Sequence, residues 1–271
     1  CRDAWSLNLE SGSNRMSLKR LLDKFIADPL GTTRNVWRKG VIEPLRYGAA
    51  PDAYDARRYW SNRFARYSDS LRGPGDEGLS DEENRREYQA AAEQFLALCR
   101  ALPVNYAAAN VLEIGPGTGY YTELLRELGV RRYLGLDIAG SYLPTLGSRF
   151  ADFVFAQADV TQLPLRNLGT DEMFDLIVVI DVIEHIVDRN ALAAALGGLR
   201  SLLTEQGRLV IAPLMESSQK HLFYVHFWSQ QDVLGCVPNL HLEAITPFRQ
   251  GQLAALRRPL EHIEGTSHGM A

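Results

Sequence analysis

The sequence has few of the features that mark secreted, membrane-spanning or disordered proteins. Only 3 of its 271 residues are cysteines, Cys1, Cys99 and Cys236, and they are widely spaced. An odd number of distant cysteines argues against a disulfide framework and favours a reducing compartment, so we expect a cytoplasmic protein. No apolar run approaches the ~18 residues that cross a bilayer. Residues 1–10 contain no apolar core of a signal peptide, and no internal repeat is present.

The charge is nearly balanced overall but unevenly distributed. The chain has 29 basic and 33 acidic side chains, a net charge of -4, and its 46% hydrophobic residues are typical of a globular protein. Residues 1–72 contain 14 basic and 8 acidic side chains, whereas the remainder contains 15 and 25. Such a basic segment contacts either an anionic partner or the acidic part of its own chain, and we favour the second interpretation.

Residues 1–104 are predicted to form a helical extension or lid. Apolar residues at helical spacing indicate a helix over residues 18–26. Ser80, with Glu83 three residues later, has the pattern of a capping box that begins another helix. That helix places Cys99 on its apolar face, so we expect a core residue rather than a nucleophile.

Residues 54–67 alternate arginine with aromatic residues. Stacking and phosphate contacts from such a segment suit single-stranded nucleic acid. The same spacing is typical of an amphipathic helix whose aromatic face packs in a core. We favour the helix, because no recognised nucleic-acid-binding module accompanies the segment. A lid over a small-molecule site is compatible with either interpretation.

From residue 105 to residue 250, short apolar strands alternate with helices. The first five strands are predicted at residues 111–114, 133–136, 153–158, 174–180 and 208–212, with a sixth at 241–245. This alternation predicts an α/β fold with a Rossmann-like, doubly wound and mostly parallel sheet. Asp137, Asp159 and Asp181 come at the ends of three strands, the edge at which open α/β sheets bind ligands.

A glycine loop follows the first strand, with the sequence Glu113-Ile-Gly115-Pro-Gly117-Thr-Gly119. Glycines allow a tight turn and a close approach of the backbone to a ligand. A dinucleotide-binding loop has the pattern G-x-G-x-x-G and holds a pyrophosphate. Here the third glycine is one residue early and a carboxylate precedes the loop. That arrangement suits a ligand with a cationic amine and a sulfonium better than a diphosphate.

Five motifs, in order at successive strand ends, resemble those of class I S-adenosylmethionine-dependent methyltransferases over residues 105–215. They are VLEIGPGTGYYTELL, YLGLDIA, FAQADVTQLPL, FDLIVVIDVIEHI and GRLVIAP. The resemblance implies S-adenosyl-L-methionine as the cofactor and a sheet of seven strands. The seventh strand is not evident, because residues 251–262 fit a helix or an edge strand. Residues 251–271 are therefore expected to be a separate, partly disordered C-terminal segment.

The resemblance also implies which residues contact the methionine part of the cofactor. Glu113 and the backbone at Gly115, Gly117 and Gly119 would line it. Asp181, at the end of the fourth strand, would lie beside the methionine part or the substrate.

Four further residues would contact the adenosine part. Asp137 would bind the ribose hydroxyls, with Ile138 packing on adenine. Asp159 would accept a hydrogen bond from the adenine amino group, and the backbone of Val160 would meet the ring. The structural alternative for Asp137 and Asp159 is helix capping in the connections between strands and helices.

Two histidines are candidates for a general base. Methyl transfer needs the acceptor atom held roughly 3 Å from the methyl group in an aligned, dry site. A hydroxyl acceptor also benefits from a base. His185 follows the fourth strand in DVIEHI, and His226 lies in YVHFWS beyond the fifth. A structural role is the alternative for each histidine.

Asp181-x-x-Glu184-His185 is similar to the E-x-x-E-H metal motif of some methyltransferases, such as ubiquinone-pathway O-methyltransferases. Carboxylates and imidazole bind divalent ions, and His226 would be a distal ligand. However, Asp replaces the first Glu, and the E-H pair also occurs in methyltransferases without a metal. We therefore assign no metal and keep a divalent ion as the disfavoured alternative.

The sequence is thus expected to encode a methyltransferase that acts on an oxygen, or secondarily a nitrogen, of a small molecule or sugar. The stretches RYWSNRF and LRGPGDEGLS are similar to the amino-terminal part of bacterial methyltransferases, some of them associated with surface-sugar synthesis. The alternatives are methylation of a nucleic acid through residues 54–67 and a cofactor-binding subunit without catalysis. A dehydrogenase is the least favoured enzyme class. The acceptor and the oligomeric state are left open.

Overall fold

The structure is a computed structural model, and it describes residues 33, 37–50, 53–162 and 173–259. The chain divides into two compact units, residues 1–48 and 49–271. The described part of the first unit contains a π-helical turn, η1 (Arg38–Ile42), followed by helix α3 (Glu43–Tyr47). The helix expected over residues 18–26 and the tail expected to be disordered lie outside the described residues.

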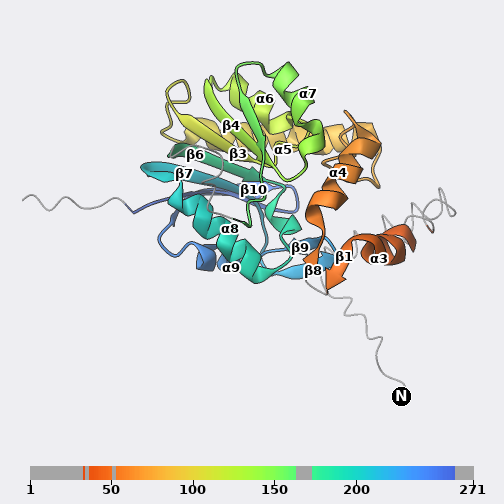
Figure 1. Cartoon of the computed structure of the whole chain (residues 1–271). Helices are drawn as coiled ribbons and strands as arrows, with labels where there is room; N and C mark the ends of the chain where they lie inside the picture. The colour runs from red at the N-terminus through yellow and green to blue at the C-terminus, as the bar shows by residue number, and fades with distance from the viewer. Residues whose placement is uncertain (1–32, 34–36, 51–52, 163–172, 260–271) are drawn as a thin grey trace, which may run out of the picture. The chain divides into compact units, whose positions relative to one another are not determined.

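Seven strands form one sheet in the second unit (Figure 1). They are β3 (Asn110–Ile114), β4 (Arg132–Asp137), β5 (Val154–Gln157), β6 (Phe174–Ile180), β7 (Leu203–Leu214), β10 (His241–Phe248) and β11 (Gly251–Arg257). Their order across the sheet is β10, β11, β7, β6, β3, β4, β5. Strand β11 is antiparallel to both of its neighbours, and every other adjacent pair is parallel. The predicted Rossmann-like, mostly parallel α/β fold is confirmed.

Strand β11 corrects the expectation of a helix or an edge strand after residue 250. It lies between β10 and β7, where Ala254 pairs with Ile211 and Ala255 with Val210. Both alanines are fully buried. A strand buried on both faces is a continuous apolar run, which periodicity cannot distinguish from a buried helix. The seventh strand is therefore present, in an interior position of the sheet.

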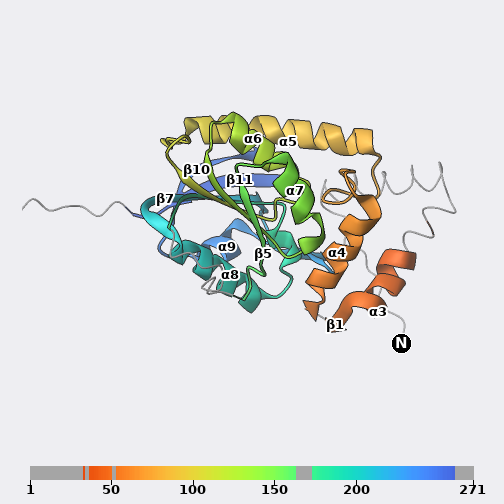
Figure 2. The same cartoon turned by 45° about the horizontal axis from the view of Figure 1, so that its top comes forward.

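Helices cover both faces of the sheet (Figures 1 and 2). They are α5 (Asp81–Ala101), α6 (Tyr120–Glu127) and α7 (Leu143–Arg149) on one face, and α8 (Arg189–Ser201) and α9 (Gln230–Cys236) on the other. Phe95 of α5 packs in one core cluster with Val178, whereas Leu196 of α8 packs in the other with Ile177. Neighbouring residues of β6 thus point to opposite buried faces.

Helix α5 begins at the predicted capping box. The Ser80 hydroxyl accepts a hydrogen bond from the Glu83 N–H at 3.2 Å, and the Glu83 carboxylate accepts one from the Ser80 N–H at 2.7 Å. Cys99, further along the helix, is fully buried. Burial raises the pKa of its thiol to about 12. The thiol is therefore protonated and packed in the core, as the sequence predicts.

Helix α4 (Ala56–Tyr67) follows a short two-stranded sheet of β1 (Gly48–Ala50) and β2 (Ala53–Tyr54). Its aromatic residues Tyr59, Trp60 and Phe64 are buried. The amphipathic-helix interpretation of this segment therefore holds.

A hairpin of β8 (Gln219–Leu222) and β9 (Val225–Phe227) presents its turn to α4, with the ring centres of Tyr59 and Tyr224 4.6 Å apart. Within the described ranges, no helix combines the length and apolar character needed to cross a membrane.

The interior position of β11 predicts a large difference between two lysine substitutions. Ala254→Lys places a charge in the buried core between the sheet and helices α8 and α9 and should lower the free energy of unfolding by at least about 3 kcal/mol. Leu242→Lys, on the outer strand β10 where the side chain is 40% exposed, should change it by less than about 0.5 kcal/mol. Urea denaturation measures both. Equal effects would contradict an interior β11.

Candidate active site

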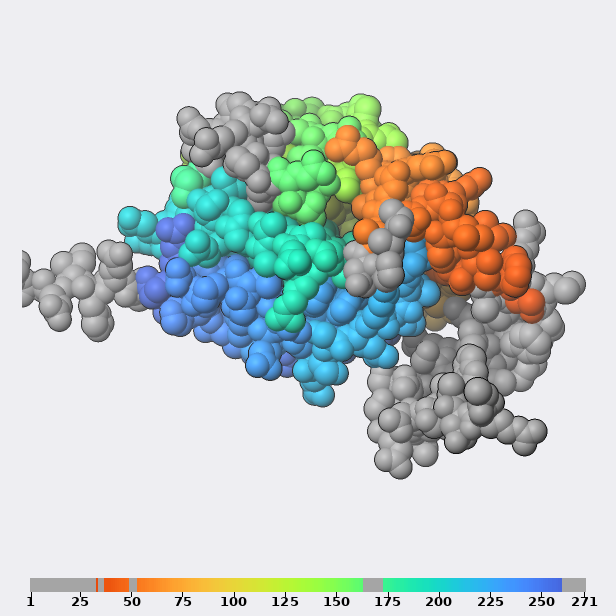
Figure 3. All heavy atoms as spheres, turned by 60° about the horizontal axis from the view of Figure 1, so that its bottom comes forward, coloured from red at the N-terminus to blue at the C-terminus, as the bar shows by residue number. Residues whose placement is uncertain are grey.

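A cavity of about 520 Å³ opens at the carboxyl edge of the parallel strands. Its lining includes Gly115 and Gly117 after β3, Asp137 and Ile138 at the end of β4, Asp159 and Val160 after β5, and Asp181 and His185 after β6. Figure 3 shows the surface hollowed between the green residues that precede position 163, the cyan residues of α8 and the orange residues of α4. This is the edge at which open α/β sheets bind ligands.

The three loop glycines are required by the backbone and by lack of space. Gly115, Gly117 and Gly119 have φ values of 70°, 56° and 81°, in the left-handed region that favours glycine. A Cβ on Gly115 would lie 2.4 Å from Val182. A Cβ on Gly119 would lie 2.8 Å from Leu146, so this glycine allows α6 and α7 to pack instead of lining the cavity. At Gly115 and Gly119 the backbone therefore lies too close to Val182 and Leu146 for any side chain to fit.

Glu113 lies in the interior next to the glycine loop and outside the cavity lining. It is 3% exposed, and its carboxylate accepts hydrogen bonds from the hydroxyls of Thr122, at 2.7 Å, and Tyr133. Burial raises the pKa of Glu113 to about 7, despite these two donors. The structure therefore places this residue as a support of the loop, between β3, β4 and α6.

Asp137 joins the end of β4 to the glycine loop. One carboxylate oxygen accepts the N–H of Ala139 at 2.8 Å, and the other lies 3.3 Å from the N–H of Gly117. Burial raises the pKa of this carboxyl to about 6, although both backbone donors lower it. A buried carboxylate of this kind gains from further donors supplied by a ligand. Ile138 lies next to it in the cavity lining.

Asp159 forms local hydrogen bonds after β5 while it also lines the cavity. Its carboxylate accepts from the N–H of Thr161 at 3.0 Å and from the side-chain amide of Gln162 at 3.0 Å. The adjacent Val160 is part of the same wall. Turn formation and ligand binding are thus compatible at this position, since a carboxylate has about four acceptor sites.

Asp181 directly follows β6, has a φ of 56° and forms an ion pair with Arg249 at 2.8 Å. Glu184, in the short helical turn η4 (Ile183–His185), is buried. Burial and the nearby Asp181 raise its pKa well above the ordinary value. In the described part of the chain, no group of three His, Cys, Asp or Glu side chains is arranged to hold a metal ion.

The structure brings one of the two candidate histidines to the cavity. His185 lines it, and its Nδ1 lies 3.0 Å from the carbonyl oxygen of Tyr224. A carbonyl can only accept, so the proton is on Nδ1 and Nε2 carries a lone pair. Burial lowers the pKa of His185 to about 4, so the ring is neutral at pH 7. His226 lies outside the lining and stacks on Trp228, with ring centres 3.9 Å apart.

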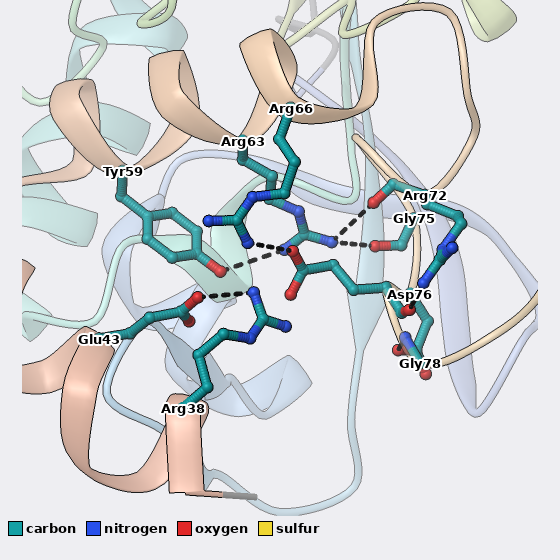
Figure 4. Close-up of polar contacts among 10 residues, drawn as sticks. Arg38, Glu43, Tyr59, Arg63, Arg66, Arg72, Gly75, Asp76 and Gly78 are labelled. Carbon is teal, nitrogen blue, oxygen red and sulfur yellow. Dashed lines mark hydrogen bonds and ion pairs between the residues drawn. The ribbon is translucent and has the colours of Figure 1, made fainter. Parts of the chain in front are cut away.

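Trp60 and Phe64, from the segment 54–67 that the sequence left open as a lid, also line the cavity, as does Pro74, which the sequence did not single out. Figure 4 shows the contacts of the buried Arg63, which lies on the same helix as Trp60 and Phe64. Its guanidinium donates to the carbonyl oxygens of Arg72, at 3.2 Å, and Gly75, on the loop that carries Pro74. The alternation of arginine and aromatics in α4 was the available signal. It indicated a buried aromatic face, but an arginine buried with that face could not be foreseen.

Comparisons with known proteins agree on one family. A family model described as a methyltransferase domain matches residues 80–258. A malonyl-[acyl-carrier protein] O-methyltransferase of Serratia marcescens is 28% identical over 146 residues, which are 54% of this chain and 51% of that protein. The chain spans about half or less of the length of the curated relatives it matches.

Two solved structures have the same fold. Magnesium protoporphyrin IX methyltransferase from Synechocystis PCC 6803, with bound S-adenosylmethionine, has a TM-score of 0.57 at 16% identity, over 78% of this chain and all of that one. A sugar N-methyltransferase from Streptoalloteichus has a TM-score of 0.50 at 17% identity, over 64% of this chain and 88% of that one.

The buried carboxyl of Glu113 predicts a pH-dependent stability in the ligand-free protein. The pKa of Glu113 rises from 4.5 to about 7 on folding. The contribution of this carboxyl to the free energy of unfolding is therefore fully present below pH 4.5 and is lost as the pH rises through 7. Glu113→Gln has no such proton and should flatten the dependence by an amount on the order of 3 kcal/mol. Urea denaturation from pH 4.5 to 8 measures this, with the exposed Glu127→Gln as control. Parallel curves for Glu113→Gln and the wild type would contradict the assignment.

Proposed function

This chain belongs to the class I S-adenosylmethionine-dependent methyltransferases, and we propose that it methylates an oxygen atom of a small molecule or a sugar. Nitrogen is the second choice of acceptor atom. One observation carries the proposal: Asp137, Asp159 and Asp181 at three strand ends and the neutral His185 line one cavity. Of the proteins that this chain resembles, one is named an O-methyltransferase and one a sugar N-methyltransferase.

The cavity lining fits a cofactor with a cationic methionine end and a polar nucleoside end. We assign the methionine part to the backbone at Gly115 and Gly117, which a ligand can approach closely, and to Asp181, because a carboxylate favours a positive charge. Glu113 and Gly119 lie outside the cavity lining and support this loop. When bound, S-adenosyl-L-methionine supplies the methyl group, the reactive carbon and the leaving sulfur.

The nucleoside part is assigned to the residues that follow β4 and β5. Asp137 accepts hydrogen bonds from the ribose hydroxyls, and Asp159 accepts one from the adenine amino group. Ile138 packs against the ring, and the backbone of Val160 meets its edge. The support for this assignment is that all four residues lie in the same cavity lining.

His185 is proposed to accept the proton of the acceptor hydroxyl. Its Nδ1 is held by the carbonyl oxygen of Tyr224, so Nε2 is the atom that can take a proton. Trp60, whose ring centre lies 4.7 Å from that of His185, and Phe64 form an apolar wall. Such a wall excludes water and keeps the acceptor aligned with the methyl group.

Removing the Asp137 carboxylate tests the cofactor site. Asp137→Ala should weaken binding of S-adenosylhomocysteine by roughly 10- to 100-fold, since hydrogen bonds to a charged group are worth roughly 1.5–3 kcal/mol. Isothermal titration calorimetry measures this. Asp152→Ala is a matched control because Asp152 is exposed on the connection between β4 and β5. Unchanged affinity in Asp137→Ala would refute the ribose assignment.

Replacing His185 tests the base and the acceptor atom. With methyl-labelled cofactor and a panel of hydroxyl and amino acceptors, His185→Gln should lower kcat by roughly 10²-fold or more and leave cofactor affinity within about twofold. His241→Gln, on the exposed start of β10, serves as control. If His226→Gln lowers kcat instead, the base is His226. A product methylated at nitrogen in place of oxygen would refute the proposed acceptor atom.

A further inference from the structure

An arginine from the turn between β10 and β11 contacts Asp181, a residue of the cavity wall. The turn between β10 and β11 carries Arg249, and its guanidinium forms an ion pair at 2.8 Å with Asp181. The two side chains are 21% and 19% exposed, so water screens this pair far less than it screens a surface pair. Asp181 lines the cavity at the end of β6. The contact therefore links the last hairpin of the chain to the proposed methionine end of the cofactor site.

The backbone at Arg249 favours a glycine. Phe248 pairs with Gly251, so Arg249 and Gln250 are the two central residues of a hairpin turn. Arg249 has a φ of 51°. Gln250 does not have a positive φ. A two-residue hairpin turn with positive φ at its first central residue alone is of type II′, and that position normally carries glycine. An arginine there costs conformational energy. The contacts of the arginine side chain must therefore explain why this position is not a glycine.

Several groups contact the Arg249 guanidinium or lie near its partner Asp181. The guanidinium carbon lies 4.6 Å from the centre of the Tyr88 ring of α5, and a terminal nitrogen lies 3.5 Å from the hydroxyl of Tyr121 of α6. Glu184 adds a second buried carboxyl near Asp181. Asp181 itself has a φ of 56°. Two strained residues from distant strands thus hold each other at the edge of the cavity, and such strain tends to collect at functional sites.

We propose that Arg249 is a positioning residue, which holds the Asp181 carboxylate in the orientation that the methionine part of S-adenosylmethionine requires. This inference rests on the proposed function, because that proposal assigns Asp181 to the cofactor. The competing explanation is that Arg249 merely fastens the hairpin to α5 and α6. The two explanations differ in what removal of the side chain does to cofactor binding and to stability.

Arg249→Gly separates these explanations, because glycine suits the turn while it removes the guanidinium. We expect binding of S-adenosylhomocysteine, measured by calorimetry, to weaken at least tenfold. The melting temperature should stay within a few degrees of the wild type, since the glycine relieves the strained backbone. Arg249→Lys keeps the positive charge and should recover part of the affinity. Arg257→Met is the control, since Arg257 pairs with Glu243 at the other end of the same hairpin.

A double-mutant cycle with Asp181→Asn shows whether Arg249 acts through Asp181. In the Asp181→Asn background, Arg249→Gly should weaken binding by less than twofold further, because the carboxylate that it positions is gone. A tenfold loss in both backgrounds would mean that Arg249 acts independently of Asp181 and would overturn the inference.

Two other outcomes are also decisive. If the wild type binds neither S-adenosylmethionine nor S-adenosylhomocysteine, the proposed function fails, and this inference fails with it. If the wild type binds and Arg249→Gly binds equally well, the inference alone is overturned. A loss of affinity that comes with a collapsed melting temperature and no recovery in Arg249→Lys would identify Arg249 as a structural fastener.

Discussion

The left-handed turn of the glycine loop between β3 and α6 is the constraint on which the cavity depends. At Gly115 a side chain would collide with Val182, and at Gly119 with Leu146 and Phe150. These close approaches bring the connections after β3 and β6 together and let α6 pack against α7. The same loop donates the N–H of Gly117 to Asp137. Glycine is therefore needed for the path of the backbone before any ligand is considered.

Burial of carboxyl groups around this loop gives the site its chemical character. Burial raises the pKa of Glu113 to about 7 and of Asp137 to about 6, and it also raises that of Asp181. The ionised forms are thus costly unless a donor or a cation compensates them. Glu113 accepts hydrogen bonds from hydroxyl groups, and Asp181 forms an ion pair with Arg249. Asp137, which faces the cavity, has capacity left for a ligand, and hydroxyl groups or a positive charge would stabilise its ionised form.

The N-terminal part of the second unit forms a fixed wall of the cavity. Arg63 is buried and joins α4 to the loop that carries Pro74. The ring of Trp60 packs against that of His185. The backbone carbonyl of His185 accepts a hydrogen bond from the hydroxyl of Tyr54. These contacts leave the imidazole neutral and oriented beside an aromatic wall.

The sequence alone determined the alternation of strands and helices, the glycine loop and the acidic residues at strand ends, because each depends on short-range patterns. The same patterns predicted the capping box of α5 and the buried face of α4. Tertiary structure alone decided that β11 is an interior strand, that His185 and not His226 lines the cavity, and that Arg249 meets Asp181. The physical reason is that burial and ion pairing join residues that are distant in the sequence. Local spacing contains no information about such partners.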